Sequence, residues 1–266
     1  MLGVLLSGRA ARWLAVTACT AFVSRWLSIV VQERPAQREP GPPAARLPAA
    51  ARAEQQLADS RLWRWVERWI ARRALAPFRV QPSFRPLRVL NLDHGPGGIA
   101  CALAGQAPQD AVVVAVDAVP GMAELARHRA ARRLMRRQVH FVRAWPLYFP
   151  FAAESFDLVV SVAGMHQWPN AEVVLSEVRR VLRPDGRYLI VDFRRDLSLP
   201  LWILARILQS LVTPRDLRAA GEPGRSIAAA YVPHEAEWLA ARAKLPDLRV
   251  EPGPAWLAIQ PATPRV

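Results

Sequence analysis

Between residues 87 and 192, short apolar runs rich in β-branched side chains alternate with segments of helical periodicity. The apolar runs are nearly continuous, which is typical of strands that are buried on both faces of a parallel sheet. Short links between each strand and the next helix favour a doubly wound arrangement. The sequence therefore predicts an α/β fold, a doubly wound Rossmann-like sheet with additional N-terminal helices.

The expected elements can be bounded from the same periodicity. Strands are predicted at 87–92, 111–116, 139–142, 157–162 and 187–192. Helices are predicted at 57–75, 97–105, 121–137, 171–182, 201–212 and 234–245. After Asp192 the alternation stops, and two short runs at 248–251 and 255–260, separated by Pro252-Gly253-Pro254, predict a terminal hairpin.

Three segments differ in composition. Residues 1–32 are apolar but contain three arginines, and the longest uncharged run there is too short for a membrane span. This segment has three open interpretations: a helix on a membrane surface, a signal sequence, or a misassigned start site. Residues 33–53 contain five prolines and predict a linker. The globular domain is expected to span 54–266.

Overall composition limits the class of protein. With 266 residues and 52% hydrophobic side chains, the chain can bury a sizeable core. Cys19 and Cys101 are far apart, so neither a disulfide framework nor a metal cluster is expected, and a reducing compartment fits. Lys244 is the only lysine among many arginines, a bias typical of a GC-rich genome. We expect a cytoplasmic protein without a metal site.

The positive charge is unevenly distributed. The net charge is +14, and residues 1–86 contain fourteen arginines but only five acidic residues. Such a region suits anionic lipid or nucleic acid. No zinc finger or RNP-type aromatic pattern is present, which argues against nucleic acid. Two interpretations remain open: a solvated basic surface, and peripheral contact with the inner face of a membrane through the N-terminal third.

The helix predicted at 57–75 has two distinct sides. Arginines recur at helical spacing along one side: Arg61, Arg64, Arg68 and Arg72. Apolar residues follow the other: Leu62, Val66, Trp69 and Ile70. We expect this helix to be a lid that packs on the main domain through its Trp side. The alternative is membrane contact by a basic, Trp-rich helix.

The stretch "VLNLDHGPGGIA" at 89–100 predicts a ligand-binding turn, because an apolar strand leads into a glycine cluster and then a helix. Gly95 and Gly97 allow the backbone to approach a ligand, and the helix offers free N–H groups at its N-terminus. Asp117 ends the next strand, where a carboxylate can accept both hydroxyls of a ribose. Its alternative role is to cap the following helix.

Two classes of nucleotide fit this turn. Gly95-x-Gly97-x-x-Ala100 matches the dinucleotide fingerprint of NAD(P)-binding oxidoreductases, with Asp117 at a suitable distance. However, Asp93 places a negative charge where a pyrophosphate would lie. The other class is an adenosyl group without phosphates.

The downstream segments "FPFAAESFDLVVSVAGMHQWPN" (149–170) and "EVRRVLRPDGRYLIVD" (177–192), together with "LNLDHGPGG", resemble the small-molecule class I S-adenosylmethionine-dependent methyltransferases. The resemblance covers roughly residues 85–193 and is strongest to the group that includes the quinone-biosynthesis methyltransferases. It implies a seven-stranded sheet whose last strand is antiparallel, with S-adenosylmethionine as cofactor. It also implies methyl transfer to carbon or oxygen of a small acceptor.

The resemblance also implies a set of cofactor-binding positions. In chain order these are Asn91, Asp93, His94, Gly95, Gly97, Asp117, Met122, Ala144, Trp145 and Ala163. The loop from Asp93 to Gly97 would surround the methionine part of the cofactor. Asp117 would bind the ribose, and Met122 would lie near the adenine. Ala163 would face the methyl-transfer site.

Several of these positions depart from the family pattern. Asn91 and Trp145 stand where the family usually has acidic residues, Asp93 where it has glycine, and His94 where small residues are common. Asp93 could bind the amino group of the cofactor or crowd the loop, and Trp145 could stack on adenine. An active methyltransferase is favoured over a binding or scaffold protein that has lost the activity.

Methyl transfer from a sulfonium needs alignment and exclusion of water more than a catalytic triad. If the acceptor is a hydroxyl, His166 is the expected general base, since histidine titrates in the useful range. The alternative is that His166 only packs at the strand end. The apolar segment 197–214, together with the helix at 57–75, would form a hydrophobic lid for a lipid- or quinone-like acceptor.

Overall fold

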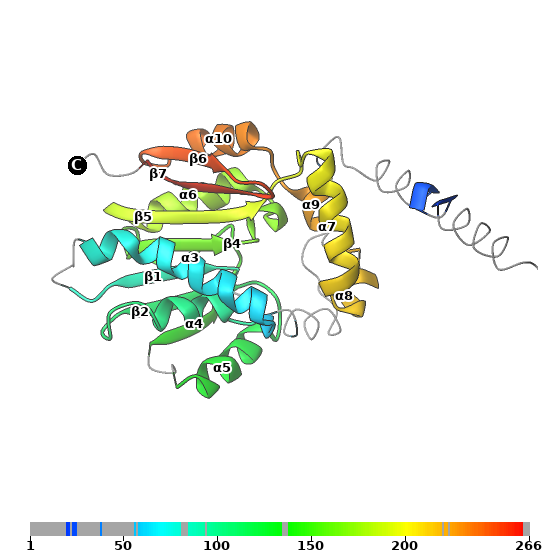
Figure 1. Ribbon diagram of the computed structural model, residues 1–266. Helices are drawn as coiled ribbons and strands as arrows, with labels where there is room; N and C mark the ends of the chain where they lie inside the picture. The colour runs from blue at the N-terminus through cyan, green and yellow to red at the C-terminus, as the bar shows by residue number, and fades with distance from the viewer. Residues whose placement is uncertain are drawn as a thin grey trace, which may run out of the picture.

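The computed structural model describes residues 20–21, 23–25, 38, 56, 58–80, 85–93, 95–134, 138–219, 221–222 and 224–262. Most of the segments 1–32 and 33–53 therefore lies outside the described residues. Within the described part, helices cover both faces of a seven-stranded sheet (Figure 1). No helix there combines the length and the apolar character needed to cross a bilayer.

The sheet has the strand order β3-β2-β1-β4-β5-β7-β6. Its strands are β1 (Arg88–Leu92), β2 (Val112–Asp117), β3 (Val139–Arg143), β4 (Phe156–Val162), β5 (Leu182–Phe193), β6 (Leu248–Pro252) and β7 (Trp256–Pro261). The first five strands run parallel, and β7 is antiparallel to both β5 and β6. The predicted doubly wound sheet with an antiparallel last strand is confirmed.

Two helical layers enclose the sheet. The helices are α3 (Arg61–Val80), α4 (Gly98–Ala104), α5 (Met122–Arg132), α6 (Ala171–Val181), α7 (Leu199–Val212), α8 (Arg215–Ala219), α9 (Gly224–Ala229) and α10 (Pro233–Arg242). Buried residues of α3, α4 and α5 form one core cluster, and those of α6 and α10 form the other. In Figure 1 the cyan α3 crosses one face of the sheet, beside α4.

The apolar character of β1 follows from its central place between these layers. Val89 belongs to the α3–α4–α5 core, whereas Leu90 and Leu92 belong to the α6–α10 core. Successive side chains of a strand point to opposite faces, so a strand covered on both faces needs an unbroken apolar run. Because β1 lies between β2 and β4, its carboxyl end and the glycine turn after it are flanked by the ends of both strands.

The prediction that the helix at 57–75 packs through its Trp side is met only in part, because Val66 and Ile70 contact the core and Trp69 packs against Trp256, whereas Leu62 is exposed. In α3 the side that contacts the core consists of Ile70, Ala71, Ala74 and Leu75. Trp65 remains 57% exposed, on the outward side together with the arginines. Small alanine side chains let two helices approach closely, and this selects the alanine side of α3 for contact with α4.

Other differences concern the ends of elements. The N-terminal helix begins at Arg61 rather than 57, because the Ser60 hydroxyl accepts a hydrogen bond from Trp63 N (3.1 Å) and caps it. It continues to Val80 through Pro77. Strand β5 begins at Leu182 rather than 187, and its pairing with β4 is irregular at that end. The short helices α8, α9 and η1 (Met165–Gln167) were not predicted.

Candidate functional site

The residues predicted to bind the cofactor lie at one edge of the sheet, where the parallel strands end. Asp93 follows β1, Asp117 ends β2, Ala144 follows β3 and Ala163 follows β4. Ligands of open α/β sheets bind beyond the carboxyl ends of the strands. The fold therefore brings these positions to the same edge, although they are far apart in sequence.

The glycines of the turn have two different functions. Gly95 (φ +49°) borders open space, because a Cβ atom built there would meet no described atom within 4 Å. Gly97 (φ +81°) caps α4, and a Cβ there would lie 2.8 Å from Ala126 Cβ. Gly97 is thus required by backbone conformation and packing, whereas Gly95 leaves room for a ligand.

Asp117 joins the two loops that border this space. One carboxylate oxygen accepts a hydrogen bond from Gly95 N (3.0 Å) and the other from Val119 N (2.8 Å). The side chain is buried. The alternative that Asp117 caps the next helix is wrong, because α5 is capped by Gly121. Asp117 instead holds the glycine turn against the end of β2.

Asp93 turns toward β4. Its backbone has a positive φ of 51°, and one carboxylate oxygen accepts hydrogen bonds from Trp168 Nε1 (2.7 Å) and Ser161 Oγ (3.2 Å). A Cβ atom at Gly164 would lie within 2.1 Å of the same oxygen. The negative charge is therefore held by donors on β4 and on the segment that follows it.

Asn91 is buried in β1, just before the turn. Its Nδ2 donates to the carbonyls of Leu92 (3.1 Å) and Val160 (3.2 Å). Its Oδ1 has no hydrogen-bond partner among the described residues. A buried acceptor without a donor is costly in free energy, so the strand end contains an unused hydrogen-bond position beside the glycine turn.

The remaining predicted cofactor-binding positions differ in burial and in their hydrogen bonds. Met122 is fully buried at the start of α5, and Ala144 N donates to the Asp117 carbonyl (3.2 Å). Trp145 is 61% exposed. Ala163 (φ +53°) donates its N–H to the Val191 carbonyl (2.8 Å). His94 lies outside the described residues.

His166 lies in η1, after β4, and is paired with a carboxylate that the sequence analysis did not identify. Its Nδ1 is 2.8 Å from Asp192 Oδ1, and its backbone N donates to Asp192 Oδ2 (2.6 Å). Both side chains are almost fully buried. Asp192 is near the end of β5, which pairs directly with β4. Asp192 could have been identified from the sequence if the ends of the predicted strands at 157–162 and 187–192 had been assumed to be neighbours.

The contact between His166 and Asp192 favours one tautomer of the imidazole. With Nδ1–H donated to the carboxylate, Nε2 is left as the acceptor nitrogen. Gln167 Nε2 lies 3.3 Å from His166 Nε2 and can donate to it. A substrate proton would reach Nε2 only after the Gln167 amide moves aside. The geometry is that of a carboxylate-oriented general base.

The segment after β5 folds over this end of the sheet. Trp202 of α7 is buried in a small core with Leu197 and Ile227, and α9 contacts η1, which contains His166. Outside this insert, Arg38 donates to the Ala229 carbonyl (2.9 Å) and stacks over the Tyr231 ring. The apolar insert thus lies beside His166 at the carboxyl ends of the strands, where it could contact an acceptor.

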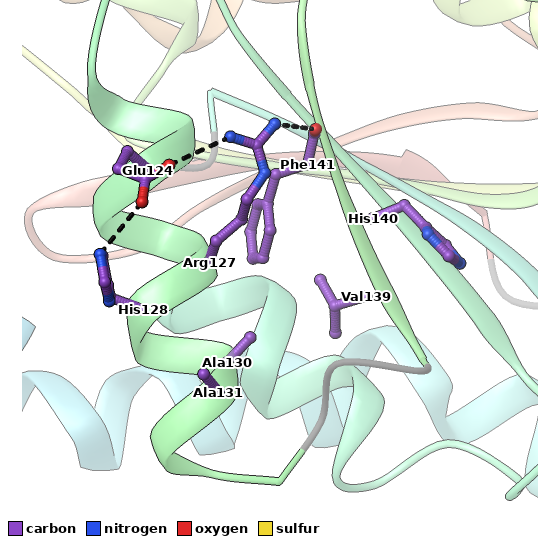
Figure 2. Close-up of a pocket in the computed structure, with 8 residues that line it drawn as sticks. All are labelled: Glu124, Arg127, His128, Ala130, Ala131, Val139, His140 and Phe141. Atoms are coloured by element: carbon purple, nitrogen blue, oxygen red, sulfur yellow. Dashed lines mark hydrogen bonds and ion pairs between the residues drawn. The ribbon is translucent and has the colours of Figure 1, made fainter.

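A separate hollow of about 480 Å³ lies on the outer edge of the sheet, between α5 and β3 (Figure 2). Arg127 crosses it and donates to the Phe141 carbonyl (3.2 Å), and His128 Nε2 lies 3.0 Å from Glu124 Oε1 on α5. Figure 2 shows His140 on the side of β3 away from α5. Glu124 thus contacts both Arg127 and His128, and the hollow is distinct from the strand-end site. Within the described residues, no three His, Cys, Asp or Glu side chains form a metal-binding group.

The order of strands and the strand-end loops define a class I S-adenosylmethionine-dependent methyltransferase fold. Residues 90–190 match the family model of the methyltransferase domain. This part of the chain is therefore similar to a methyltransferase domain, as the resemblance implied.

Curated relatives match the same part of the chain. A demethylmenaquinone methyltransferase from Thermus thermophilus is 37% identical over 108 residues, which are 41% of this chain and 48% of the relative. The ubiquinone/menaquinone biosynthesis C-methyltransferase UbiE from Rhizobium meliloti is 32% identical over 137 residues, 52% of this chain and 50% of the relative. The chain spans about half the length of the curated relatives it matches.

Solved structures show the same fold at low sequence identity. A SAM-dependent methyltransferase from Aquifex aeolicus superposes with a TM-score of 0.57 at 16% identity, covering 81% of this chain and 98% of the other. The carbon methyltransferase CurJ superposes with a TM-score of 0.58 at 14% identity, covering 79% and 58%. At these identities the likeness concerns the fold alone.

Proposed function

We propose that this chain binds S-adenosylmethionine at the ends of β1, β2 and β4 and transfers its methyl group to a small, apolar, quinone-like acceptor. The observation that carries the proposal is the Asp117 carboxylate, which is hydrogen-bonded to Gly95 N at the border of open space. A carboxylate at this strand end can accept the ribose hydroxyls. The open backbone at Gly95 leaves room for the methionine part.

The departures from the family pattern are compatible with a bound cofactor. Asp93 is held by Trp168 and Ser161, where a carboxylate can accept from the ammonium group of the methionine part. The unused Oδ1 of Asn91 provides a further acceptor at the same strand end. Trp145 lies mostly in solvent and does not fill the space beside Gly95. Met122 and Ala144 would border the adenine.

The residues beyond β4 supply what the acceptor needs. The sulfonium of the cofactor provides an activated methyl group, so the protein has to align the acceptor and remove its proton. His166 Nε2 would take the proton from an acceptor hydroxyl, and Asp192 would stabilise the resulting imidazolium. Gln167 would leave Nε2 as the acceptor enters. Asp192 acts through His166 and is therefore a positioning residue.

The acceptor class is inferred from two features. The insert beside His166 is apolar, with Trp202, Leu197 and Ile227 in its core. The curated relatives are named for demethylmenaquinone and for ubiquinone/menaquinone biosynthesis. A quinol-like ring has a hydroxyl that His166 could deprotonate, and methylation can then occur at that oxygen or at a ring carbon. NMR of the methylated product would distinguish the two positions.

The cofactor proposal is tested by calorimetric titration of the full chain with S-adenosylmethionine and S-adenosylhomocysteine, with NADH as the control ligand. We expect saturable binding of both sulfur compounds, and binding at least about tenfold weaker in Asp117→Ala, which loses a charge-assisted contact to the ribose. Asp110→Ala is the matched control, an exposed carboxylate at the opposite end of β2. Its affinity should equal that of the wild type.

Two outcomes would contradict the proposed cofactor. Absence of binding to either sulfur compound would indicate a scaffold protein that has lost the activity. Binding of NADH instead would indicate an oxidoreductase. If the cofactor binds, a panel of acceptors tests the second half: methylation of polar acceptors but not of a short-chain quinol would refute the apolar acceptor.

A further inference from the structure

The outward side of α3 combines aromatic, aliphatic and cationic side chains. Leu62 and Trp65 are 62% and 57% exposed, and Trp69 is 39% exposed. The exposed arginines of the same helix are Arg61, Arg68, Arg72 and Arg79. At 100° per residue, these arginines form one stripe and the Leu and Trp residues form the adjacent stripe. The opposite side of α3 is buried in the core.

The charge on this side is of one sign. Glu67 is the only acidic residue in the twenty residues of α3, and it is buried against α4. The exposed surface of α3 therefore presents arginines without an acidic residue of its own helix beside them. This is unusual for a solvated helix, where charges of both signs alternate along the exposed side.

We propose that the outward side of α3 is a docking surface for an anionic lipid bilayer. Arginines near an anionic surface are attracted by its negative potential. Exposed Trp and Leu side chains insert at the boundary between headgroups and acyl chains. The helix would lie in the plane of the membrane surface, with its buried side still packed on α4. The inference does not depend on the proposed methyl transfer.

The mixed character of this surface favours a bilayer over nucleic acid. A phosphate backbone would be bound by arginines through charge alone, and its bases would need aromatic rings arranged for stacking in a groove. Leu62 and Trp65 are three residues apart on the exposed side of a single helix. They suit insertion into an apolar phase better than stacking between bases.

The test is co-sedimentation of the full chain with phosphatidylcholine vesicles that do or do not contain phosphatidylglycerol. We expect binding to the anionic vesicles that weakens as salt is added. Arg68→Glu with Arg72→Glu should lower the partition coefficient by about tenfold or more. Leu62→Ala with Trp65→Ala should lower it by about tenfold, through the loss of inserted apolar area.

Matched variants on other elements control for charge and exposed area. Arg179→Glu with Arg249→Glu reverses two exposed charges on α6 and β6. Val173→Ala with Trp238→Ala removes exposed apolar side chains from α6 and α10, on the other face of the sheet. Both controls should bind vesicles like the wild type. Circular dichroism would show that all four double variants are folded.

Three results would overturn the proposal. The first is equal binding to neutral and anionic vesicles. The second is vesicle binding by the two α3 variants that equals the wild type, which would place any membrane contact elsewhere in the chain. The third is the absence of vesicle binding combined with arginine-dependent binding of duplex DNA or RNA, which would assign the surface to nucleic acid.

Discussion

At the scale of single residues, the candidate site is distinguished by strained backbone and buried carboxylates. Asp93 (φ +51°) and Ala163 (φ +53°) are non-glycine residues in the left-handed region, and they directly follow β1 and β4. Such conformations cost free energy and concentrate at functional sites. Asp117 and Asp192 are both buried at strand ends. Each carboxylate is held by backbone N–H groups, which orient it before any ligand binds.

The role of Asp192 is tested by Asp192→Asn. An amide cannot stabilise the imidazolium and permits the other proton arrangement on His166, so kcat should fall on the order of 10²-fold. The Kd for S-adenosylmethionine should not change, because the pair does not contact the glycine turn. The pH profile of kcat should also change, because the His166 ring no longer faces a carboxylate.

Asp196→Asn is the matched control for this variant. Asp196 also follows β5, but its carboxylate pairs with Arg194 (2.7 Å). It should retain wild-type kcat. A purely structural role of Asp192 would instead lower the melting temperature and the cofactor affinity together, and would leave the pH profile of the residual activity unchanged.

At the scale of elements, the contact between α3 and α4 includes a buried acid. A Cβ atom at Gly98 would lie within 1.7 Å of Glu67 Oε1, so glycine at this position makes room for the carboxyl group. Burial raises the pKa of Glu67 to about 7, although Arg129, 3.9 Å away, opposes the shift. Arg129 is itself buried and bonded to Asp59 (2.6 Å). We therefore expect the stability of the α3–α4 contact to depend on pH.

Glu67→Gln tests this dependence. In the wild type, the unfolded chain releases the proton near pH 4.5 and the folded chain near pH 7. The folded state therefore binds more protons in this window, and the free energy of unfolding falls as pH rises through it, by about 3 kcal/mol from this group. The variant should match the wild type at about pH 4 and below, and exceed it at pH 8 in urea unfolding.

Glu237→Gln, an exposed glutamate on α10, is the control and should follow the wild type at every pH. The interpretation fails if Glu67→Gln is less stable than the wild type at pH 8, since this would mean that the charged carboxylate is favourable where it lies.

At the scale of the whole molecule, we expect the two ends of the parallel strands to have different roles, one in binding and the other in stability. The candidate site occupies the edge where the parallel strands end. At the other edge, buried Asp157 accepts hydrogen bonds from Arg88 N (2.8 Å), Arg85 (2.8 Å) and Arg183 (2.6 Å). These contacts connect the beginnings of β1, β4 and β5. Burial alone would raise the pKa of Asp157, but the three donors outweigh it and lower the pKa.

Asp157→Asn should separate stability from binding. The uncompensated arginines should lower the free energy of unfolding by roughly 3 kcal/mol, while the Kd for S-adenosylmethionine stays unchanged. Because the folded pKa is lowered, the stabilisation by Asp157 is present above about pH 4 and is lost as pH falls through the folded pKa. Urea unfolding and calorimetry measure the two effects.

Asp185→Asn removes an exposed carboxylate from the same edge and is the control. A large loss of cofactor affinity in Asp157→Asn, at a temperature where the variant is folded, would show that the two edges are coupled and would contradict this division.

Much of the fold and part of the site could be predicted from the sequence. The order of strands and helices follows from local periodicity, and the turn after β1 follows from glycines that sit at positive φ, such as Gly95 and Gly97. Asp117 was found because a strand end is a local feature. Asp192 was missed because its relation to His166 exists only when β4 and β5 become neighbours.

The sequence by itself thus determined the α/β class and the order of strands and helices, since these depend on local patterns, and its short motifs predicted the ligand-binding edge and the cofactor class. Only the tertiary structure decided that Asp93 turns toward Trp168, that Asp192 orients His166 and that α3 is covered on its alanine side. Each of these depends on which elements pack together, and a side chain's partner is chosen by packing across distant segments rather than by its own place in the sequence.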